Sequence, residues 1–274
     1  MTAVSADRPT DADIDPRPPL TRLVLSTPGL IATRLLIIGA FLLAWELASG
    51  TVLPKFWLSS PSAISARLVQ WVNDGSLWRH LEATLTAMGV GYVIGCAVGI
   101  AAGLALGFLP FVQRILMPYL AGLYALPKIA LAPLFIILFG IDIESKIALV
   151  AITVFFMLLY NTLDGVRDVD GDLVQALELM GASRREIGLK VLLPATLPWI
   201  FTGMRISVRY ALTAAILGEV IGANRGVGYL IEASAGQYNT TGVYAGVFVL
   251  VVCCVTLTEL LTRAETSTRR GRTD

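Results

Sequence analysis

Charged residues are scarce in this chain. Of its 274 residues only 15% are Asp, Glu, Lys or Arg, whereas 55% are hydrophobic. Soluble domains usually contain about 25% charged residues, and the mean hydropathy of +0.73 is high as well. The composition therefore predicts a protein that is surrounded mainly by lipid. The formal net charge of +1 leaves no basic excess that would bind nucleic acid.

Residues that support metal, redox or nucleotide chemistry are also few. His80 is the single histidine, and the cysteines Cys96, Cys253 and Cys254 lie in apolar runs without CxxC spacing. We therefore expect no metal site, and we interpret the cysteines as small packing residues and His80 as a partly exposed interface residue. The chain has no G-x-x-x-x-G-K-[ST] motif, so we expect it neither to bind a cofactor nor to hydrolyse ATP itself.

Two other classes of membrane protein stay open as alternatives. A stand-alone secondary transporter would usually show internal repeats of its spans, and no convincing repeat is visible. A membrane-embedded enzyme, the weaker alternative, would need paired carboxylates, a histidine-rich metal site, or a nucleophile with a base. The acidic residues of the apolar regions are scattered instead, at Glu46, Asp142, Glu144, Glu219 and Glu259.

The long apolar runs define the expected architecture, an all-α membrane protein with six transmembrane helices. The polar, proline-rich residues 1–30 predict a disordered cytoplasmic tail and do not have the form of a signal peptide. A transmembrane domain over 31–264 follows, and then a cytoplasmic tail over 265–274. A helix needs about 20 apolar residues to cross a bilayer. The six expected spans cover about 31–52, 83–109, 115–139, 147–162, 199–221 and 242–261.

Two of these regions carry further signals. The third span contains Pro127 and Pro133, which predict breaks. The segment before the second span contains apolar residues near helical spacing and three tryptophans, which favour a helix lying along the membrane interface.

Glycines recur every fourth residue along the second span. This smooth ridge allows another helix to approach closely. It favours packing within the chain, and contact with a second subunit is the alternative. The ridge consists of Gly91, Gly95, Gly99, Gly103 and Gly107.

Lys and Arg residues of the connecting segments predict the orientation. With a cytoplasmic amino terminus, the inner segments hold thirteen of these residues and the outer segments hold five. Lys128, Arg205 and Arg209 fall within spans and belong to neither group. We therefore expect a multi-pass protein with both termini in the cytoplasm.

A short charged segment, about 168–194, reads as a helical hairpin between the fourth and fifth spans. Asp170 or Asp172 can cap its first helix. On that helix, spacings of three and four residues place one apolar group on a single face. The group consists of Leu173, Ala176, Leu177 and Met180.

The second half of the hairpin has equally clear signals. Gly181 fits the left-handed position just past a helix end. Ser183 and Glu186 have the spacing of a capping box, so a second helix is expected to start at once, with Ile187 on its apolar face. Pro194 is expected to stop it before the fifth span. Such a rigid cytoplasmic knob could transmit force to two spans, although a surface hairpin lying on lipid headgroups is the alternative.

The same stretch, "ALELMGASRREIGLKVLLPATLP", resembles the coupling loop of permease subunits of ABC importers, whose pattern is roughly EAA, then Gly, then Ile-x-LP. Gln175 and Leu177 stand where that pattern has Glu and a second Ala. The flanking segments "FGIDIESKIALV" and "GMRISVRYALTAAILGEVIGANRGVGYLI" resemble the branch that imports nitrate, taurine and alkanesulfonates. The resemblance covers most of residues 35–265. The loop positions that match are Ala176, Gly181, Ile187, Leu193 and Pro194.

The resemblance implies a type I importer permease in a bacterial cytoplasmic membrane. Its coupling hairpin docks on cytoplasmic ABC ATPase subunits, a second permease subunit completes the path, and an extracytoplasmic binding protein delivers the solute. A homodimer is the expected permease pair. In such systems the binding protein sets most of the selectivity, so the sequence indicates only a small, anionic solute such as a sulfonate, taurine or nitrate.

Ionisable residues within the spans are candidates for the translocation path. Arg205 and Arg209 share one face of the fifth span, and Glu219 lies near its outer end. Lys128 follows the first proline break of the third span. Arg209 could attract an anionic solute, or it could pair with a carboxylate such as Glu46 or extend toward the inner membrane surface. The resemblance implies that Arg205 and Glu219 occupy positions that are commonly basic and acidic in the family.

Overall fold

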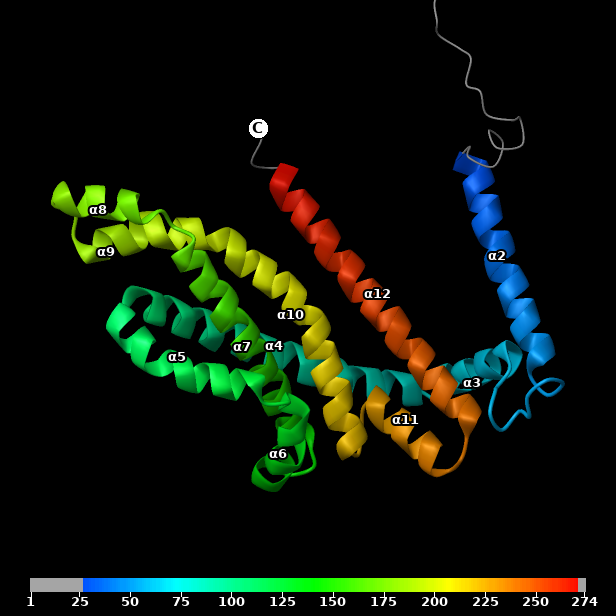
Figure 1. Cartoon of the computed structure of the whole chain (residues 1–274). Helices are drawn as coiled ribbons and strands as arrows, with labels where there is room; N and C mark the ends of the chain where they lie inside the picture. The colour runs from blue at the N-terminus through cyan, green and yellow to red at the C-terminus, as the bar shows by residue number, and fades with distance from the viewer. Residues whose placement is uncertain (1–26, 271–274) are drawn as a thin grey trace, which may run out of the picture. The chain divides into compact units, whose positions relative to one another are not determined.

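The computed structural model describes residues 27–270, with side chains described over 29–260. The predicted tail over 1–26 and the last four residues lie outside the described residues. The chain divides into two compact units, Met1–Pro61 and Ser62–Asp274. Between residues 27 and 270 the regular structure is helical, apart from one isolated bridge from Ser49 to Leu53 (Figure 1). The predicted all-α class is confirmed.

The first unit contains one long helix, α2, which spans Thr27–Ala48. It begins and ends four residues earlier than the predicted span and therefore includes the end of the predicted tail. The indole Nε1 of Trp45 donates a hydrogen bond of 2.8 Å to the carbonyl oxygen of Ser59, which folds the following segment back onto the helix end. The apolar side chains of α2 are otherwise exposed, as a helix facing lipid requires.

The helix α3, Pro61–Asn73, begins at the last residue of the first unit and forms where the sequence predicted a helix. The left-handed Gly75, with a φ of 73°, separates α3 from α4, which spans Ser76–Phe108. The carboxylate of Asp74 accepts a hydrogen bond of 2.8 Å from the backbone N–H of Ser76 at the start of α4. The second predicted span is therefore confirmed as a helix that starts earlier than its apolar core.

The glycine ridge of α4 packs against α7, which spans Ile143–Arg167. A Cβ atom on Gly95 would lie 2.7 Å from the carbonyl oxygen of Ala151, and one on Gly99 would lie 2.6 Å from that of Phe155. Real side chains do not approach that closely, so only glycine allows this contact. The ridge therefore serves packing within the chain, which was the favoured prediction.

The other side of α7 packs against α10, which spans Leu193–Ile221. Glycines again allow the approach, since a Cβ atom on Gly165 would lie 2.7 Å from Cβ of Trp199. A Cβ atom on Gly203 would lie 2.9 Å from Cβ of Asn161. The buried core between the three helices includes Leu149, Val150, Val154, Leu158, Leu212 and Ala215.

The third apolar run forms a bent pair rather than one straight helix. Its parts are α5, Pro110–Ala125, η1, Lys128–Leu131, and α6, Ala132–Phe139. The chain bends by 85° between α5 and the rest. Pro127 makes this break, because the residue before a proline is pushed out of the helical conformation. The second predicted break is wrong: Pro133 lies in the first turn of α6, where its missing N–H costs nothing.

Two helices complete the unit at its carboxyl end. The first, α11, spans Val227–Gly236 and lies between the fifth and sixth predicted spans, where the sequence analysis predicted no helix. The second, α12, spans Thr240–Arg270, so its backbone runs past the predicted span into the predicted tail over 265–274. The pair is tightly packed, because a Cβ atom on Gly242 would lie 2.4 Å from Oγ of Ser234.

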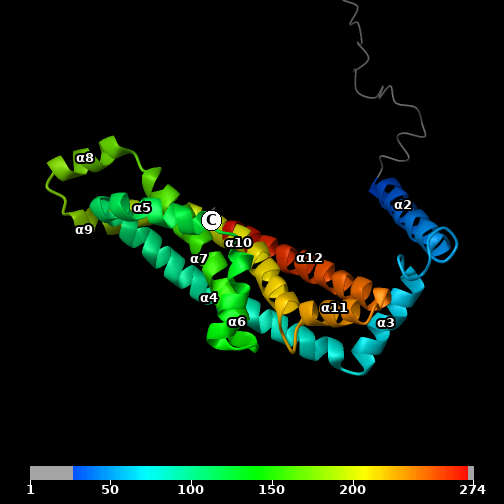
Figure 2. The same cartoon turned by 60° about the horizontal axis from the view of Figure 1, so that its bottom comes forward.

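The hairpin helices α8, Gly171–Leu179, and α9, Arg184–Ile187, lie at one end of the second unit, and α11 lies at the other (Figures 1 and 2). Over the described residues, five helices are long and apolar enough to cross a membrane, or six if the bent pair counts as one span. The predicted set of spans thus corresponds to the helices of the structure.

Candidate functional site

The hairpin begins with a side-chain cap. The carboxylate oxygen Oδ1 of Asp170 accepts a hydrogen bond of 2.9 Å from the backbone N–H of Asp172. This bond satisfies one of the amides that a helix start leaves without a partner. Of the two caps that the sequence allowed, Asp170 is the one used.

The first helix ends at Gly181 in the predicted left-handed conformation, with a φ of 87°. The N–H of Gly181 donates to the carbonyl of Glu178, and the N–H of Ala182 donates to that of Leu177, each at 3.0 Å. These two bonds form a Schellman motif, which satisfies carbonyl groups at the helix end. The turn is thus closed by the backbone itself.

The second helix starts with the predicted capping box. The N–H of Glu186 donates to Oγ of Ser183 at 3.3 Å, and the N–H of Ser183 donates to Oε2 of Glu186 at 3.1 Å. Lys190 forms an ion pair with Glu186 at 3.2 Å. The Schellman motif and the capping box thus lie within five residues of each other. They fix both sides of the turn, which makes the hairpin stiff.

The prediction that Pro194 stops the second helix is wrong. One π turn, η2, Gly188–Leu192, joins α9 to α10, and the helix runs without interruption from Arg184 to Ile221. Because Pro194 has no N–H, it cannot bond to the carbonyl four residues earlier. The wider turn accommodates this loss, and the N–H of Leu193 bonds to the carbonyl of Gly188, five residues back. The hairpin is therefore connected directly to the fifth span.

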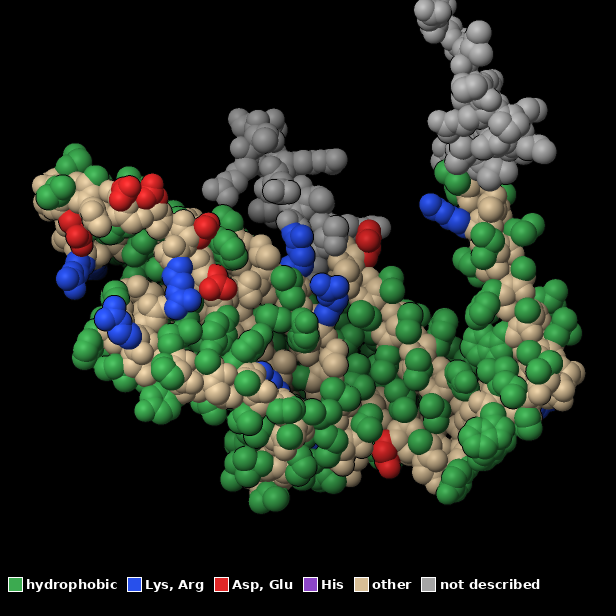
Figure 3. All heavy atoms as spheres, in the orientation of Figure 1, with side chains coloured by type: hydrophobic (Ala, Val, Ile, Leu, Met, Phe, Trp, Pro, Cys, Tyr) green, Lys and Arg blue, Asp and Glu red, His purple; other side chains and the backbone are tan. Residues whose placement is uncertain are grey.

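The hairpin exposes apolar side chains although it is otherwise charged. Leu173 is 48% exposed, Met180 is 82% exposed, and Ala176 is exposed between them, whereas Leu177 is half-buried. Leu179, which the sequence did not single out, is 90% exposed. Figure 3 shows charged side chains gathered over the α8–α9 end, while hydrophobic side chains cover the middle of the visible face.

Ile187 supports the hairpin from within, because it is only 4% exposed. It therefore does not contribute to the exposed face, although it lies in the segment that the sequence singled out. We define the docking face as the exposed members of the predicted apolar group, which are Leu173, Ala176 and Met180.

The two predicted arginines lie one turn apart on α10 with exposed side chains. Arg205 and Arg209 are four residues apart, so they share one face of the helix. Among the side chains described, 29–260, no carboxylate forms an ion pair with Arg209. A guanidinium held on a span without such a partner can attract an anion.

Lys128 lies directly after the bend of the third span. Its ammonium donates to the carbonyl of Tyr124 and lies 4.2 Å from the centre of the Tyr124 ring. A small pocket of about 160 Å³ extends from Lys128 to Thr153 and Tyr210. The bend thus places a cation beside α7 and α10.

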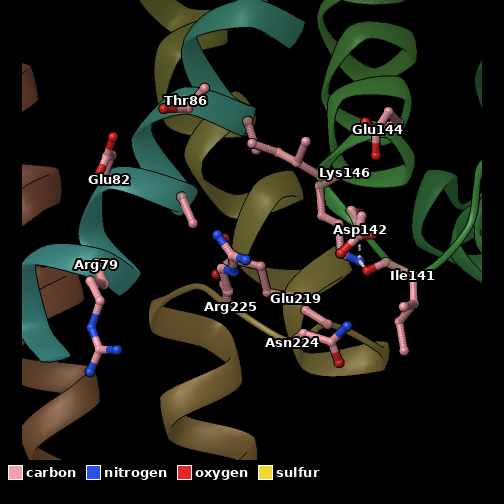
Figure 4. A pocket seen from close by; sticks show the side chains of 14 residues that line it. Arg79, Glu82, Thr86, Ile141, Asp142, Glu144, Lys146, Glu219, Asn224 and Arg225 are labelled. Carbon is pink, nitrogen blue, oxygen red and sulfur yellow. Dashed lines mark hydrogen bonds between the residues drawn. The ribbon is translucent and has the colours of Figure 1, made fainter.

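Glu219 lies far from the other predicted path residues. The 14 positions between Arg205 and Glu219 correspond to about 21 Å along α10. Glu219 is 3% exposed and contributes to a polar pocket of about 450 Å³. Figure 4 shows this pocket between the first turns of α4, the start of α7 and the turn after α10, with Arg225 directed into it. The structure therefore does not bring the four predicted residues together.

Sequence reasoning missed one buried cation, one partner of Glu219, and the hydrogen bond that His80 forms. Lys146 is 3% exposed and donates to the carbonyl of Asp142 at 3.1 Å. Thr84 donates a hydrogen bond of 3.0 Å to Oε2 of Glu219. His80 accepts one of 3.0 Å from the N–H of Gly226, so it is more than an interface residue. No local pattern in the sequence links these residues, which lie up to 146 positions apart.

A comparison with protein families matches residues 91–270 to the family of inner membrane components of binding-protein-dependent transport systems. The chain belongs to this family. The permease is therefore a multi-pass inner-membrane component of a transport system and not itself an enzyme. The matched range begins in the glycine ridge and includes the whole hairpin, the bent span and α10 to α12.

Curated relatives of the permease agree with this assignment. It is 32% identical over 206 residues to the formylaminopyrimidine transport permease protein ThiX of Halalkalibacterium halodurans, covering 75% of this chain and 82% of the relative. It is also 32% identical over 251 residues to the taurine transport system permease protein TauC of Escherichia coli, covering 90% and 89%. The putative aliphatic sulfonates permease SsuC of Bacillus subtilis is 32% identical over 219 residues, covering 80% and 79%.

Solved structures show the same fold. The permease matches a chain of the MetNI methionine ABC transporter in an inward-facing conformation with a TM-score of 0.56 and 21% identity. The match covers 72% of this chain and 96% of that chain. The predicted bundle of a type I importer permease is thereby confirmed.

Proposed function

We propose that the permease forms part of the translocation path of an ATP-driven importer for a small anionic solute, such as a sulfonate, taurine or nitrate. Its partners are cytoplasmic ABC ATPase subunits, an extracytoplasmic solute-binding protein and a second permease subunit. That second subunit is another copy of this chain. Both termini and the hairpin lie on the cytoplasmic side of the membrane.

The observation that carries this proposal is the exposed docking face on a stiff hairpin. Met180 is 82% exposed although an apolar side chain gains free energy when it leaves water. Two caps and a Schellman motif hold this face in a fixed direction. The unbroken helix from Arg184 to Ile221 connects it to the fifth span. A partner that pushes the hairpin therefore moves the span as one body.

The proposal of an anionic solute has two supports. Arg209 has an exposed guanidinium on α10 that no carboxylate neutralises within residues 29–260. Two of the relatives are described as permeases for taurine and for aliphatic sulfonates, whose sulfonate group carries a negative charge. Lys128 adds a second cation beside α7 and α10.

The second permease copy must use a surface other than the glycine ridge, because α7 already fills that ridge. Several helices of the second unit remain apolar and exposed. On α5, for example, none of the residues is buried, and Phe111 and Tyr119 are 77% and 70% exposed. Lipid and a second copy are the two surroundings that suit such a surface.

The test of the docking face replaces Ala176 with aspartate. The variant Ala176→Asp places a charge in the middle of the face, where docking would desolvate it without a partner. We expect the amount of ATPase that co-purifies with the permease to fall by about tenfold or more. Uptake of taurine by cells that produce the complete transporter should fall in parallel, with unchanged insertion of the permease into the membrane.

The matched control is Gln175→Asp on the same helix. Gln175 is exposed and lies about 200° around the helix from Leu173, so its side chain points away from the docking face. This variant should retain the ATPase and the uptake of the parent. If Ala176→Asp also retains both, the hairpin is not the coupling element and the lipid-surface alternative is favoured. If both variants lose the ATPase equally, added charge rather than its position is responsible.

A further inference from the structure

The amino terminus of α11 is held by three side chains from two other helices. The N–H of Gly226 donates to Nδ1 of His80 at 3.0 Å, and the N–H of Val227 donates to Oγ1 of Thr84 at 2.8 Å. The N–H of Gly228 donates to Oε2 of Glu219 at 2.8 Å. The first amides of a helix have no partner within it, so they require such external acceptors. Here α4 and α10 supply all three.

Glu219 and Thr84 form the buried part of this arrangement. Glu219 is 3% exposed and Thr84 is 1% exposed. The hydroxyl of Thr84 accepts from Val227 and donates to Oε2 of Glu219 at 3.0 Å. The same carboxylate oxygen therefore receives one bond from α4 and one from α11. Removing it would leave the buried N–H of Gly228 without its acceptor, which is costly, while the hydroxyl of Thr84 would keep only the longer contact of 3.2 Å with the carbonyl oxygen of His80.

Glycine makes this approach possible. A Cβ atom on Gly226 would lie 2.1 Å from Cδ of Glu219, and one on Gly228 would lie 2.8 Å from Cβ of Glu219. Gly226 also has a φ of 124°, which other residues rarely adopt. The backbone of the turn thus lies directly against the carboxylate.

The arrangement joins two tightly packed groups of helices. One group is α4, α7 and α10, which pack through glycines and a buried apolar core. The other is α11 with α12, where a Cβ atom on Gly246 would lie 2.4 Å from Cγ1 of Ile231. The bonds to Glu219 and Thr84 connect α11 to the first group at the end far from the hairpin (Figure 1).

The turn between α10 and α11 also forms one wall of the polar pocket of about 450 Å³. Ala223, Asn224 and Arg225 line that pocket from the turn. Figure 4 shows Arg225 directed into it and Asn224 at its border. The position of this wall therefore depends on the hydrogen bonds that hold the end of the turn and the start of α11.

We propose that Glu219 is a positioning residue whose carboxylate, together with Thr84, fastens the turn at 222–226 and the start of α11. We call this arrangement the latch. It determines the position of the wall of the polar pocket and joins α11 and α12 to α4, α7 and α10. This role needs a hydrogen-bond acceptor at position 219 and does not require contact with the solute.

The direct test measures amide hydrogen exchange of the full-length permease in lipid nanodiscs. The variant Glu219→Leu removes the acceptor, and we expect the amides of 226–228 to exchange about tenfold faster or more. Glu219→Gln keeps an oxygen that can accept both bonds, so its exchange should stay within about threefold of the parent. Exchange within α7 should be unchanged in both variants.

A second pair of variants tests the latch from α4. Thr84→Val removes the hydroxyl at nearly constant volume and should accelerate exchange of the same amides, whereas Thr84→Ser should restore the protection. The double variant Thr84→Val with Glu219→Leu should exchange little faster than either single variant, because both act on one connection. The variants Thr84→Val and Thr84→Ser still test the latch if Glu219→Leu fails to fold.

The matched control is Glu82→Leu, which removes an exposed carboxylate from the same pocket outside the latch. It should leave exchange at 226–228 as in the parent. A transport measurement rests on the proposed function: taurine uptake should fall about tenfold in Glu219→Leu and stay near the parent in Glu219→Gln and Glu82→Leu. Failure of the parent to import taurine would count against the proposed function, while the exchange measurement still decides the latch.

Three results would overturn the latch. The first is unchanged exchange at 226–228 in both Glu219→Leu and Thr84→Val. The second is Glu219→Gln exchanging as fast as Glu219→Leu, which would assign the effect to charge. The third is accelerated exchange throughout α4, α7 and α10, which would make Glu219 a general determinant of the fold.

Discussion

The glycines of α4 show how single residues decide the packing of this bundle. Between apolar helices in a membrane the hydrophobic effect supplies little attraction, so close contact of backbones has to supply it. Each ridge glycine lies where a side chain would overlap α7, as with Gly91, whose Cβ atom would lie 2.6 Å from Cβ of Val150. Glycine is therefore required at these positions, because any larger side chain would overlap α7.

The smallest possible side chain tests this requirement. Gly95→Ala would place a methyl group 2.7 Å from the backbone of Ala151, which cannot move without its helix. We expect a loss of about 1–3 kcal/mol of stability, as for other overpacked cores. The measurement is the fraction of full-length permease that remains monodisperse in detergent after heating, which should fall at a lower temperature than in the parent.

Gly89→Ala is the matched control for that experiment. Gly89 lies on the same helix, and a Cβ atom there would meet nothing within 4 Å. Alanine also favours helix over glycine by about 1 kcal/mol. The control should therefore be as stable as the parent or slightly more stable. Equal losses in both variants would show that the contact with α7 is not the cause.

At the scale of one element, the hairpin depends on its turn. Gly181 has a φ of 87° and no atoms within 4 Å of an added Cβ, so its conformation matters and its size does not. Gly181→Val should strain the turn by roughly 1–2 kcal/mol, because a branched side chain disfavours the left-handed region. Asparagine tolerates this region, so Gly181→Asn should behave like the parent.

Limited proteolysis of the permease alone measures this strain. Trypsin can cleave after Arg184 or Arg185, which are exposed directly behind the turn. Gly181→Val should be cleaved there faster than the parent, because the start of α9 loses its fixed geometry. The same rate in Gly181→Val and Gly181→Asn would mean that the turn adapts without strain.

The bent span is a second element in which one residue decides the geometry. Pro127 ends the helical path, and the chain turns by 85° before η1. Pro133 has the same chemistry and no such effect, because it occupies the first turn of α6. The position of a proline relative to a helix start, and not its presence, therefore determines whether the span breaks.

For the whole molecule, the main prediction is its orientation. Single cysteines are introduced after Cys96, Cys253 and Cys254 have been replaced. Asn73→Cys, at the end of α3, should react in intact cells with a thiol reagent that cannot cross the membrane. Arg185→Cys and Gly271→Cys should react only after the membrane is opened, because an excess of Lys and Arg keeps those segments in the cytoplasm.

These labelling positions leave the capping groups intact. Labelling at Asn73 spares the neighbouring Asp74, whose carboxylate bonds to Ser76, and labelling at Arg185 spares Ser183 of the capping box. Reaction of Arg185→Cys from outside in intact cells would reverse the orientation and place the docking face away from any cytoplasmic ATPase. Equal reaction of all three positions would indicate that the cells leak.

The sequence alone determined the features whose signals are local. The caps at Asp170 and Ser183, the left-handed Gly181 and the break at Pro127 each depend on residues a few positions apart. Backbone geometry is set at this range, so the turn and the capping box of the hairpin could be predicted, whereas the predicted stop at Pro194 was wrong. The spans followed from composition, because a bilayer requires long apolar helices.

Only the tertiary structure decided which surfaces meet. Lipid and a membrane-protein interior are both apolar, so hydrophobic periodicity does not distinguish the face of α4 that packs on α7 from one that faces lipid. The smooth path from η2 into α10 depends on how a π turn accommodates Pro194. The latch depends on Thr84 and Glu219, 135 positions apart, and their contact exists only because the helices between them fold as they do.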